Sequence, residues 1–171
     1  KGHPSYDYEL RGGTIYNVGT LNGINADFDS NYMTLSNSSS ENGSDASVDG
    51  GSFYNANVVT GTGITGNFIN NYVSGTAYAP ETSSSSVRTF ARGGAIVNSG
   101  TINKINANFI NNYAMSTATG AGYNYGYTEG GAIWNVSDKE TSQTNGAIID
   151  LIEGKFIGNR AIASYGAYGG A

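Results

Sequence analysis

The most informative stretch of the sequence is residues 93–113, which read GGAIVNSGTINKINANFINNY and have recognisable counterparts along the chain. Each counterpart opens on a Gly-Gly pair, and the five pairs begin at residues 12, 50, 93, 130 and 169. The spacings between them are 38, 43, 37 and 39 residues. Recurrence at this period indicates a protein built from stacked repeats, each too short to bury an apolar face alone.

Matched positions recur once per repeat behind the first four Gly-Gly pairs. An Asn lies five residues after the first glycine; later come an Ile, a Phe four residues on, and a second Asn three residues after the Phe. We expect the glycines and asparagines to form corners of stacked coils, where glycine turns the backbone and amides bond along the stack. The corner positions are Gly12, Gly13, Asn17, Asn31, Gly50, Gly51, Asn55, Asn71, Gly93, Gly94, Asn98, Asn112, Gly130, Gly131, Asn135 and Asn159. The expected core positions are Ile15, Ile24, Phe28, Phe53, Ile64, Phe68, Ile96, Ile105, Phe109, Ile133, Ile152 and Phe156.

The composition favours the same kind of fold. Gly accounts for 26 of 171 residues and charged residues for only 12%, which disfavours helical bundles. The sequence therefore predicts an all-β chain: one domain, residues 1–171, forming a parallel β-helix (a solenoid) of about four coils stacked about 4.8 Å apart. Segments rich in Ser, Gly and Thr vary between repeats and are expected to be variable surface loops: residues 33–49, 74–92, 115–129 and 136–147.

Two short motifs carry a resemblance to a known family. Gly-Gly-Ala-Ile occurs at residues 93–96 and 130–133, and Phe-x-x-Asn occurs at residues 28–31, 68–71, 109–112 and 156–159. Paired in this way, they resemble the repeats of the chlamydial polymorphic outer membrane proteins and of related bacterial adhesin-like proteins. The resemblance implies an exported, right-handed parallel β-helix that acts in adhesion at the cell surface. Its partner would be a protein or glycan on a host or neighbouring cell.

Aromatic residues mark the expected contacts with a ligand or partner. Within residues 115–129 three tyrosines alternate and either present one aromatic face or pack the loop onto the solenoid: Tyr123, Tyr125 and Tyr127. A second set shares one column of the repeat: Tyr16, Tyr54 and Trp134. Alternation places this column opposite the neighbouring Ile, so it forms either an outward stripe that binds sugars or proteins, or a buried second layer.

Charge and composition exclude several classes of partner. The net charge of −5 lacks the basic footprint of a nucleic-acid-binding protein. No apolar run reaches the roughly 18 residues that a membrane span requires, so no span is expected in this chain. The chain contains no Cys, and therefore no disulfide framework or thiolate nucleophile. No cofactor is predicted.

Candidates for chemistry are few. Asp27 and Asp29 point to one side of a strand, and Asp150 lies close to Glu153 in sequence, but no acid, base and positioning group converge. We therefore expect a non-catalytic protein, with a polysaccharide-active enzyme as the more distant alternative. Two further sites have little sequence support because neither pattern repeats fully. One is a Ca²⁺ site built on Asp45 and Asp49, and the other is an ice-binding array built on Thr20, Thr60 and Thr101.

The two ends of the chain show no capping segment, and the last residues, Tyr168-Gly169-Gly170-Ala171, open a fifth repeat. Uncapped coils leave strand edges open to pairing. Two alternatives remain open. Either the chain is part of a longer surface array whose further repeats stack on it, or copies of the chain stack end to end as subunits of an extracellular filament.

Overall fold

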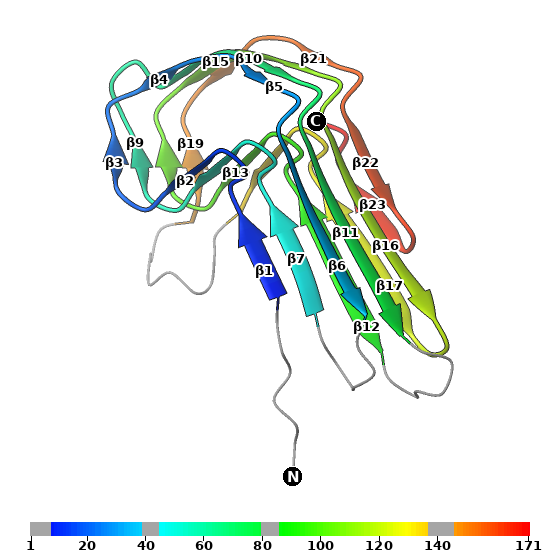
Figure 1. Ribbon diagram of the computed structural model, residues 1–171. Helices are drawn as coiled ribbons and strands as arrows, with labels where there is room; N and C mark the ends of the chain where they lie inside the picture. The colour runs from blue at the N-terminus through cyan, green and yellow to red at the C-terminus, as the bar shows by residue number, and fades with distance from the viewer. Residues whose placement is uncertain (1–7, 39–44, 80–85, 137–145) are drawn as a thin grey trace.

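A computed structural model describes residues 8–38, 45–79, 86–136 and 146–171, and in these residues every regular element is a β-strand (Figure 1). All pairings between the strands are parallel, and each repeat contributes strands to five sheets in turn. The predicted all-β chain of stacked parallel repeats is therefore confirmed. Parallel stacking of this kind fits a β-helix or solenoid.

Three sheets of short strands follow each Gly-Gly pair. The glycine sheet contains β2 (Ile15–Asn17), β8 (Phe53–Asn55), β13 (Ile96–Asn98) and β18 (Ile133–Asn135). The short sheet contains β3 (Thr20–Leu21), β9 (Val58–Val59), β14 (Thr101–Ile102) and β19 (Ile148–Ile149). The phenylalanine sheet contains β4 (Ile24–Asn25), β5 (Phe28–Asp29), β10 (Ile64–Ile69), β15 (Ile105–Ile110), β20 (Ile152–Glu153) and β21 (Phe156–Ile157).

Two sheets of mostly longer strands complete each repeat and run side by side (Figure 1). The tyrosine sheet contains β6 (Tyr32–Ser38), β11 (Tyr72–Ala79), β16 (Tyr113–Gly120) and β22 (Arg160–Ala163). The return sheet contains β1 (Tyr8–Arg11), β7 (Asp45–Asp49), β12 (Val87–Arg92), β17 (Asn124–Glu129) and β23 (Gly166–Tyr168).

The prediction of surface loops is wrong for the described parts of residues 33–49, 74–92 and 115–129, because these parts form most of the tyrosine and return sheets. Residues 39–44 and 80–85 of these ranges lie outside the described residues. Their burial alternates along the strands, and small inward residues let the two sheets pack against each other. Between the sheets lie Val48, Val73, Ala91 and Ala114, with a second cluster of Ala77, Ala79, Val87 and Ala118. Of the fourth expected loop, residues 137–145 lie outside the described residues.

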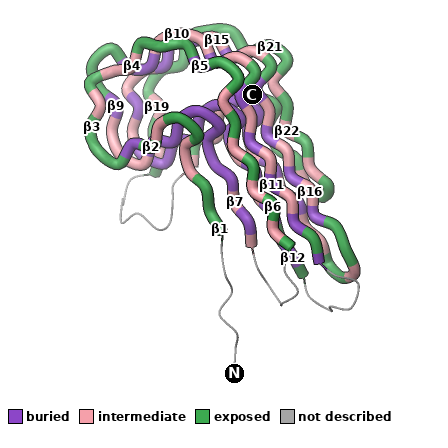
Figure 2. The backbone as a smooth tube through the Cα atoms, viewed as in Figure 1, coloured by how far each residue is buried: buried purple, intermediate pink, exposed green. Residues whose placement is uncertain are grey.

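The main apolar core lies within the bend formed by the glycine, short and phenylalanine sheets, where buried residues gather (Figure 2). Of the expected core positions, the fully or nearly buried ones are Phe28, Phe53, Ile64, Phe68, Ile96, Ile105 and Phe109, and the partly buried ones are Ile15, Ile24 and Ile133. Ile152 and Phe156 differ from the expectation, since they are 42% and 37% exposed. Their strands pair with β15 on one side, and no described strand covers the other side.

Both asparagine columns form hydrogen-bonded ladders. In the glycine sheet, Nδ2 of Asn17 donates to Oδ1 of Asn55 at 2.7 Å, and Asn55 donates in the same way to Asn98 at 2.7 Å. Asn98 continues the ladder to Asn135 at 2.8 Å. At the corner before the tyrosine sheet, Asn31, Asn71, Asn112 and Asn159 are linked in the same manner at 2.9 to 3.0 Å. Each ladder satisfies polar groups that would otherwise be buried without partners.

The two glycines of each pair serve different purposes. The first has a positive φ, from 58° at Gly93 to 74° at Gly50 in the first four pairs, a region that glycine enters without strain. The second lies against the next repeat: a Cβ on Gly94 would overlap the carbonyl oxygen of Gly131 and crowd the Tyr113 backbone. The corner therefore depends on conformational freedom at one residue and on close approach at the other.

Replacing Gly94 by Ala is expected to lower the free energy of unfolding by about 3 kcal/mol, because the added methyl group meets backbone atoms that must move. Urea denaturation followed by circular dichroism measures the change. Gly19 provides the control, since a Cβ there would meet no atom within 4 Å. We expect Gly19→Ala to change stability by less than about 1 kcal/mol. Equal effects of the two substitutions would contradict the close approach of the stacked corners.

Candidate binding surface

Aromatic side chains gather on the return sheet. Tyr125 and Tyr127 occupy alternate positions of β17, with ring centroids 6.1 Å apart, and Tyr165, just before β23, meets both rings edge-on at 4.9 and 5.3 Å. Phe90 of β12 stacks on Tyr127 at 5.5 Å. These four residues, Phe90, Tyr125, Tyr127 and Tyr165, are called the aromatic patch below. Tyr165 is 63% exposed and the other three are half-buried.

The structure brings together two of the three tyrosines that sequence alternation predicted to share a face. Tyr123 lies in the turn between β16 and β17, is 72% exposed, and makes no ring contact within the described part of the chain. Sequence reasoning missed Phe90 and Tyr165, because both contacts depend on which strands are neighbours. Desolvation, reinforced by Tyr165 and Tyr125, raises the pKa of Tyr127, so its hydroxyl stays protonated near neutral pH.

A ladder of alternating charge borders the aromatic patch at the end of the return sheet. Arg11, Asp49, Arg92 and Glu129 are paired in register on adjacent strands. Nε of Arg92 contacts Glu129 at 3.2 Å, and its Nη1 lies 3.6 Å from Asp49. These four residues come directly before the first four Gly-Gly pairs, so the alternation of sign at that position was a sequence signal for the ladder.

Of the two alternatives left open for the column of Tyr16, Tyr54 and Trp134, burial favours the buried layer over the outward stripe. Tyr54 is only 2% exposed, and Val97 in the same column is fully buried. The Arg11 guanidinium lies 5.1 Å from the Tyr54 ring centroid, and that of Arg92 lies 4.6 Å from the Trp134 ring centroid. The column is thus covered by the charge ladder, and Tyr16 in the first repeat is its main exposed member, at 47%.

Asp49 is the buried carboxylate of the charge ladder. It is 2% exposed, accepts hydrogen bonds from the Ser47 hydroxyl at 3.1 Å, and faces Arg92. Burial raises the pKa of Asp49 to about 6, with a further contribution from the charge of Glu9, although Arg92, Ser47 and Arg11 act in the opposite direction. The protein therefore holds this proton more tightly than the unfolded chain does.

The stability that Asp49 contributes is expected to be fully present below pH 4 and to be lost as the pH rises through about 6. Between pH 4 and 7 the loss is on the order of 2 to 3 kcal/mol. Urea denaturation of the wild type and of Asp49→Asn over this pH range measures this loss. The free energy of unfolding of the variant is expected to exceed that of the wild type by an amount that increases as the pH rises. A constant difference between the two proteins would show that Asp49 titrates at its ordinary pKa.

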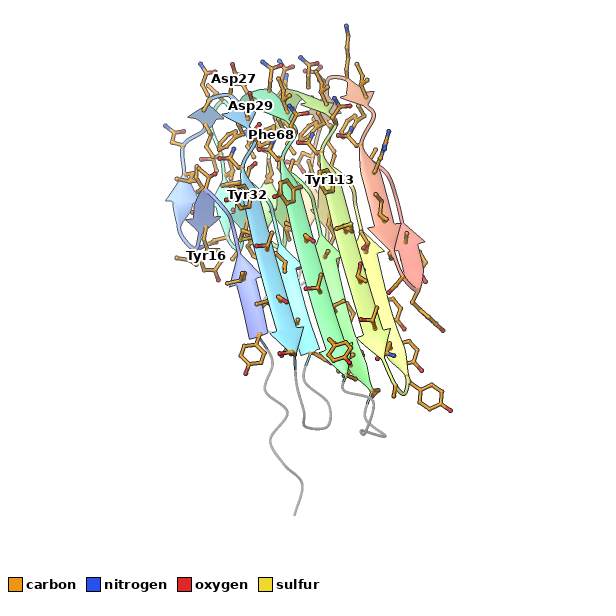
Figure 3. The ribbon with its side chains drawn as sticks, turned by 45° about the vertical axis from the view of Figure 1, so that its right-hand side comes forward. Tyr16, Asp27, Asp29, Tyr32, Phe68 and Tyr113 are labelled. Atoms are coloured by element: carbon orange, nitrogen blue, oxygen red, sulfur yellow. The ribbon has the colours of Figure 1, made fainter. Side chains whose placement is uncertain are left out.

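The carboxylates considered for catalysis have structural partners. Oδ1 of Asp27 accepts hydrogen bonds from the backbone N–H and the Nδ2 of Asn67, both at 2.8 Å, so it begins a polar column on the phenylalanine sheet. Asp29 accepts a hydrogen bond from Ser30, and both aspartates lie at the outer edge of the structure (Figure 3). Glu153 pairs with Lys104 at 2.6 Å. The structure does not bring these groups together with Asp150 around a common cavity in the described residues.

The geometry does not support the Ca²⁺ site or the ice-binding threonine array. Asp45 pairs with Arg88 at 2.7 Å and Asp49 faces Arg92, so each carboxylate already has a cationic partner. Residues 8–38, 45–79, 86–136 and 146–171 contain no cluster of three or more metal-ligating side chains. The threonine column is misaligned: Val58, and not Thr60, pairs with Thr20 and Thr101.

Comparisons with known proteins give no relative: no family model, no curated protein and no solved structure matches the chain. In the described residues, no helix has the length and apolar character needed to cross a membrane. The surface itself is therefore the basis for assigning a function.

Proposed function

We propose that the chain forms a right-handed parallel β-helix that serves as a non-catalytic, adhesin-like structural and interaction module outside the cell or at its surface. The observation that carries this function is the aromatic patch on the return sheet. Its exposed and half-buried rings form a preorganised surface, held in place by strands that are paired in register. Aromatic residues of this kind contribute strongly to binding when a partner covers them.

The rest of the molecule supports a rigid spacer. The two asparagine ladders and the column of stacked Phe rings fix the repeats relative to one another. The motif resemblance to bacterial adhesin-like repeats agrees with this role. The partner would be a protein or glycan on a host or neighbouring cell, and the exposed face of the patch would contact it.

Binding to cell surfaces tests this function. The fluorescently labelled chain is expected to bind cells saturably, and Tyr125→Ser together with Tyr165→Ser is expected to weaken binding at least about tenfold, since each lost aromatic anchor is worth 1 kcal/mol or more. Tyr78→Ser is the control, because Tyr78 is also an exposed tyrosine, at 45%, but lies on the tyrosine sheet. Absence of saturable binding, or equal losses in both proteins, would overturn the proposal.

A second candidate function, a self-assembling filament subunit, is favoured by the apolar edge of the last repeat. Ile152, Phe156 and Ile157 are 37 to 51% exposed and continue the registered columns of the phenylalanine sheet. A second copy that presents its first repeat would extend these columns. Negative-stain microscopy over a concentration series tests this idea: filaments with an axial repeat near 20 Å, four strand spacings, would support it. Single particles at all concentrations would exclude it.

A further inference from the structure

A pocket of about 420 Å³ lies at the corner between the phenylalanine and tyrosine sheets, away from the aromatic patch. Its lining residues are Asn70, Asn111, Tyr113, Gly158 and Arg160. They come from three successive repeats, so the pocket runs along the stacking direction. Its volume falls within the range of small-molecule sites.

The first wall of the pocket is a column of residues in the left-handed backbone region. Asn70 and Asn111 both have φ of 54°, and Gly158 follows with φ of 65°. The next residue in each repeat belongs to the asparagine ladder, where its amide is used internally. The amides of Asn70 and Asn111, by contrast, are exposed and have no hydrogen-bond partner among the described residues. They offer two donor–acceptor groups spaced by one strand separation, about 4.8 Å.

Gly158 leaves this column unfilled at its third position. A Cβ built on Gly158 would overlap the Oδ1 of Asn111, so the absence of a side chain at this position leaves room for that amide at the edge of the pocket. Asn tolerates the left-handed region, as Asn70 and Asn111 show. Asn can therefore be introduced at Gly158 with the same backbone conformation, and its Cβ would displace the Asn111 amide oxygen.

The second wall is the end of a tyrosine stack. The rings of Tyr32, Tyr72 and Tyr113 stack with centroids 5.3 and 4.8 Å apart and interplanar angles of 9° and 2°, on the outward face where Figure 3 shows Tyr32 and Tyr113. The faces between the rings are occupied by neighbouring rings. In the fourth repeat Arg160 takes the place of tyrosine, so the far face of Tyr113 has no aromatic neighbour among the described residues and borders the pocket.

Arg160 supplies a positive charge. Its side chain is exposed and has no ion pair within the described part of the chain, whereas Arg88 and Arg92 are paired with carboxylates. In a chain of net charge −5, a guanidinium that has no ion pair among the described residues and lies at a pocket can attract an anion. Its planar fork of N–H groups matches a carboxylate bidentately.

We propose that this pocket binds an acidic saccharide, a pyranose ring that carries a carboxylate. The carboxylate pairs with Arg160, the C–H face of the sugar ring packs on the free face of Tyr113, and ring hydroxyls exchange hydrogen bonds with the amides of Asn70 and Asn111. An aromatic face, two amides and one guanidinium together match a ring that has several hydroxyls and a single charge. The proposal rests on the proposed surface-interaction function and names a ligand class and a second contact site for it.

NMR titration of the ¹⁵N-labelled chain tests the assignment, with methyl glucuronide as the acidic probe, methyl glucoside as its neutral counterpart and acetate as an anion without a ring. The glucuronide is expected to shift the side-chain amide signals of Asn70 and Asn111 with a dissociation constant of about 1 mM. Glucoside and acetate are each expected to bind at least about tenfold more weakly. Equal shifts with acetate would reduce the site to a general anion site and overturn the saccharide assignment.

Single substitutions distinguish a loss of ligand binding at the pocket from a loss of folding stability. Arg160→Gln and Gly158→Asn are each expected to weaken glucuronide binding about tenfold or more, the first by removing the positive charge and the second by displacing the Asn111 amide. The urea midpoint is expected to stay nearly unchanged, because both positions are exposed and the atom that Gly158→Asn displaces is the end of an exposed side chain. Lys155→Gln is the matched control: this exposed lysine of the same repeat also lacks an ion pair in the described residues but does not line the pocket. Unchanged binding in Arg160→Gln, or an equal loss in Lys155→Gln, would overturn the proposal.

The cell-binding assay distinguishes failure of the pocket assignment from failure of the proposed surface function. If the glucuronide does not bind but the chain still binds cells through the aromatic patch, the pocket assignment fails and the surface function stands. If neither binds, both fail.

Discussion

Replacing Asn98 by Asp is expected to lower the free energy of unfolding by about 3 to 5 kcal/mol at pH 7, because it leaves a buried charge without a cationic partner. Asn98 is fully buried, and its Nδ2 donates to Oδ1 of Asn135 at 2.8 Å, to the Gly100 carbonyl at 3.1 Å and to the Ile148 carbonyl at 3.0 Å. A carboxylate of nearly the same shape cannot donate, so three acceptors would face a negative charge. Urea denaturation followed by circular dichroism measures the loss.

Asn135→Asp is the matched control at the exposed end of the same ladder. Its Oδ1 accepts a hydrogen bond from Asn98, which a carboxylate accepts equally well. Within the described part of the chain its own Nδ2 makes one bond, to the Ala147 carbonyl at 3.2 Å. We expect a change below about 1 kcal/mol. Comparable losses at Asn98 and Asn135 would contradict a ladder that is buried in its middle and open at its end.

Replacing Phe68 by Ala is expected to lower the free energy of unfolding by about 3 to 5 kcal/mol, since it creates a cavity inside the core. Phe68 is fully buried, and its ring is stacked between those of Phe28 at 4.7 Å and Phe109 at 5.0 Å. Its backbone is paired on both sides by β5 and β15, so the strands are not free to collapse into the space. Thermal and urea denaturation both report the change.

Phe156 occupies the same column one repeat after Phe109, with a ring separation of 4.8 Å, but is 37% exposed. Phe156→Ala is expected to cost about 1 to 2 kcal/mol, because less apolar surface is removed from water on folding. A loss at Phe156 as large as that at Phe68 would mean that the last repeat is covered in solution, by a second copy of the chain or otherwise.

The stacked positions of the repeat could be predicted from sequence because they are chemically distinctive. Asn at a fixed distance from Gly-Gly, and Asn at a fixed distance from Phe, occur at positions that the structure pairs in register. The alignment of Thr60 with Thr20 failed because the distance from the preceding Asn differs between the two repeats. Thr60 lies two residues further from Asn55 than Thr20 does from Asn17, and Val58 takes the paired position.

The tyrosine and return sheets could not be predicted with the same rules. Their inward residues are often Ala, Gly, Ser or Thr, as at Gly75, Ser116 and Thr128, so the strands lack the bulky apolar alternation that usually marks a buried face. Ser116 and Thr128 instead share a buried hydrogen bond of 2.8 Å between the two sheets. Sequence composition alone made these segments look like loops.

The candidate sites depended on neighbours that sequence spacing does not specify. The contact of Tyr165 with Tyr125 requires that β23 follow β17 in the return sheet, and the pocket beside Tyr113 requires that Arg160 be its partner in register. The charge ladder that covers Tyr54 and Trp134 likewise becomes visible once the strands preceding each Gly-Gly pair are aligned.

The central claim, that equivalent residues of successive repeats stack in register, is tested most directly by spin labels. The chain contains no Cys, so pairs of introduced cysteines can be labelled cleanly. Ser36 and Thr117 lie in one column, two strands apart, so their Cα atoms are expected about 10 Å from each other. Thr34 and Thr119 are offset by four residues along the strands, which gives about 16 Å.

Continuous-wave electron paramagnetic resonance on the diluted, doubly labelled proteins should show strong dipolar broadening for Ser36→Cys with Thr117→Cys. Only weak broadening is expected for Thr34→Cys with Thr119→Cys. Equal broadening in the two pairs, or none in the first, would contradict the registered stack on which the account of this protein rests.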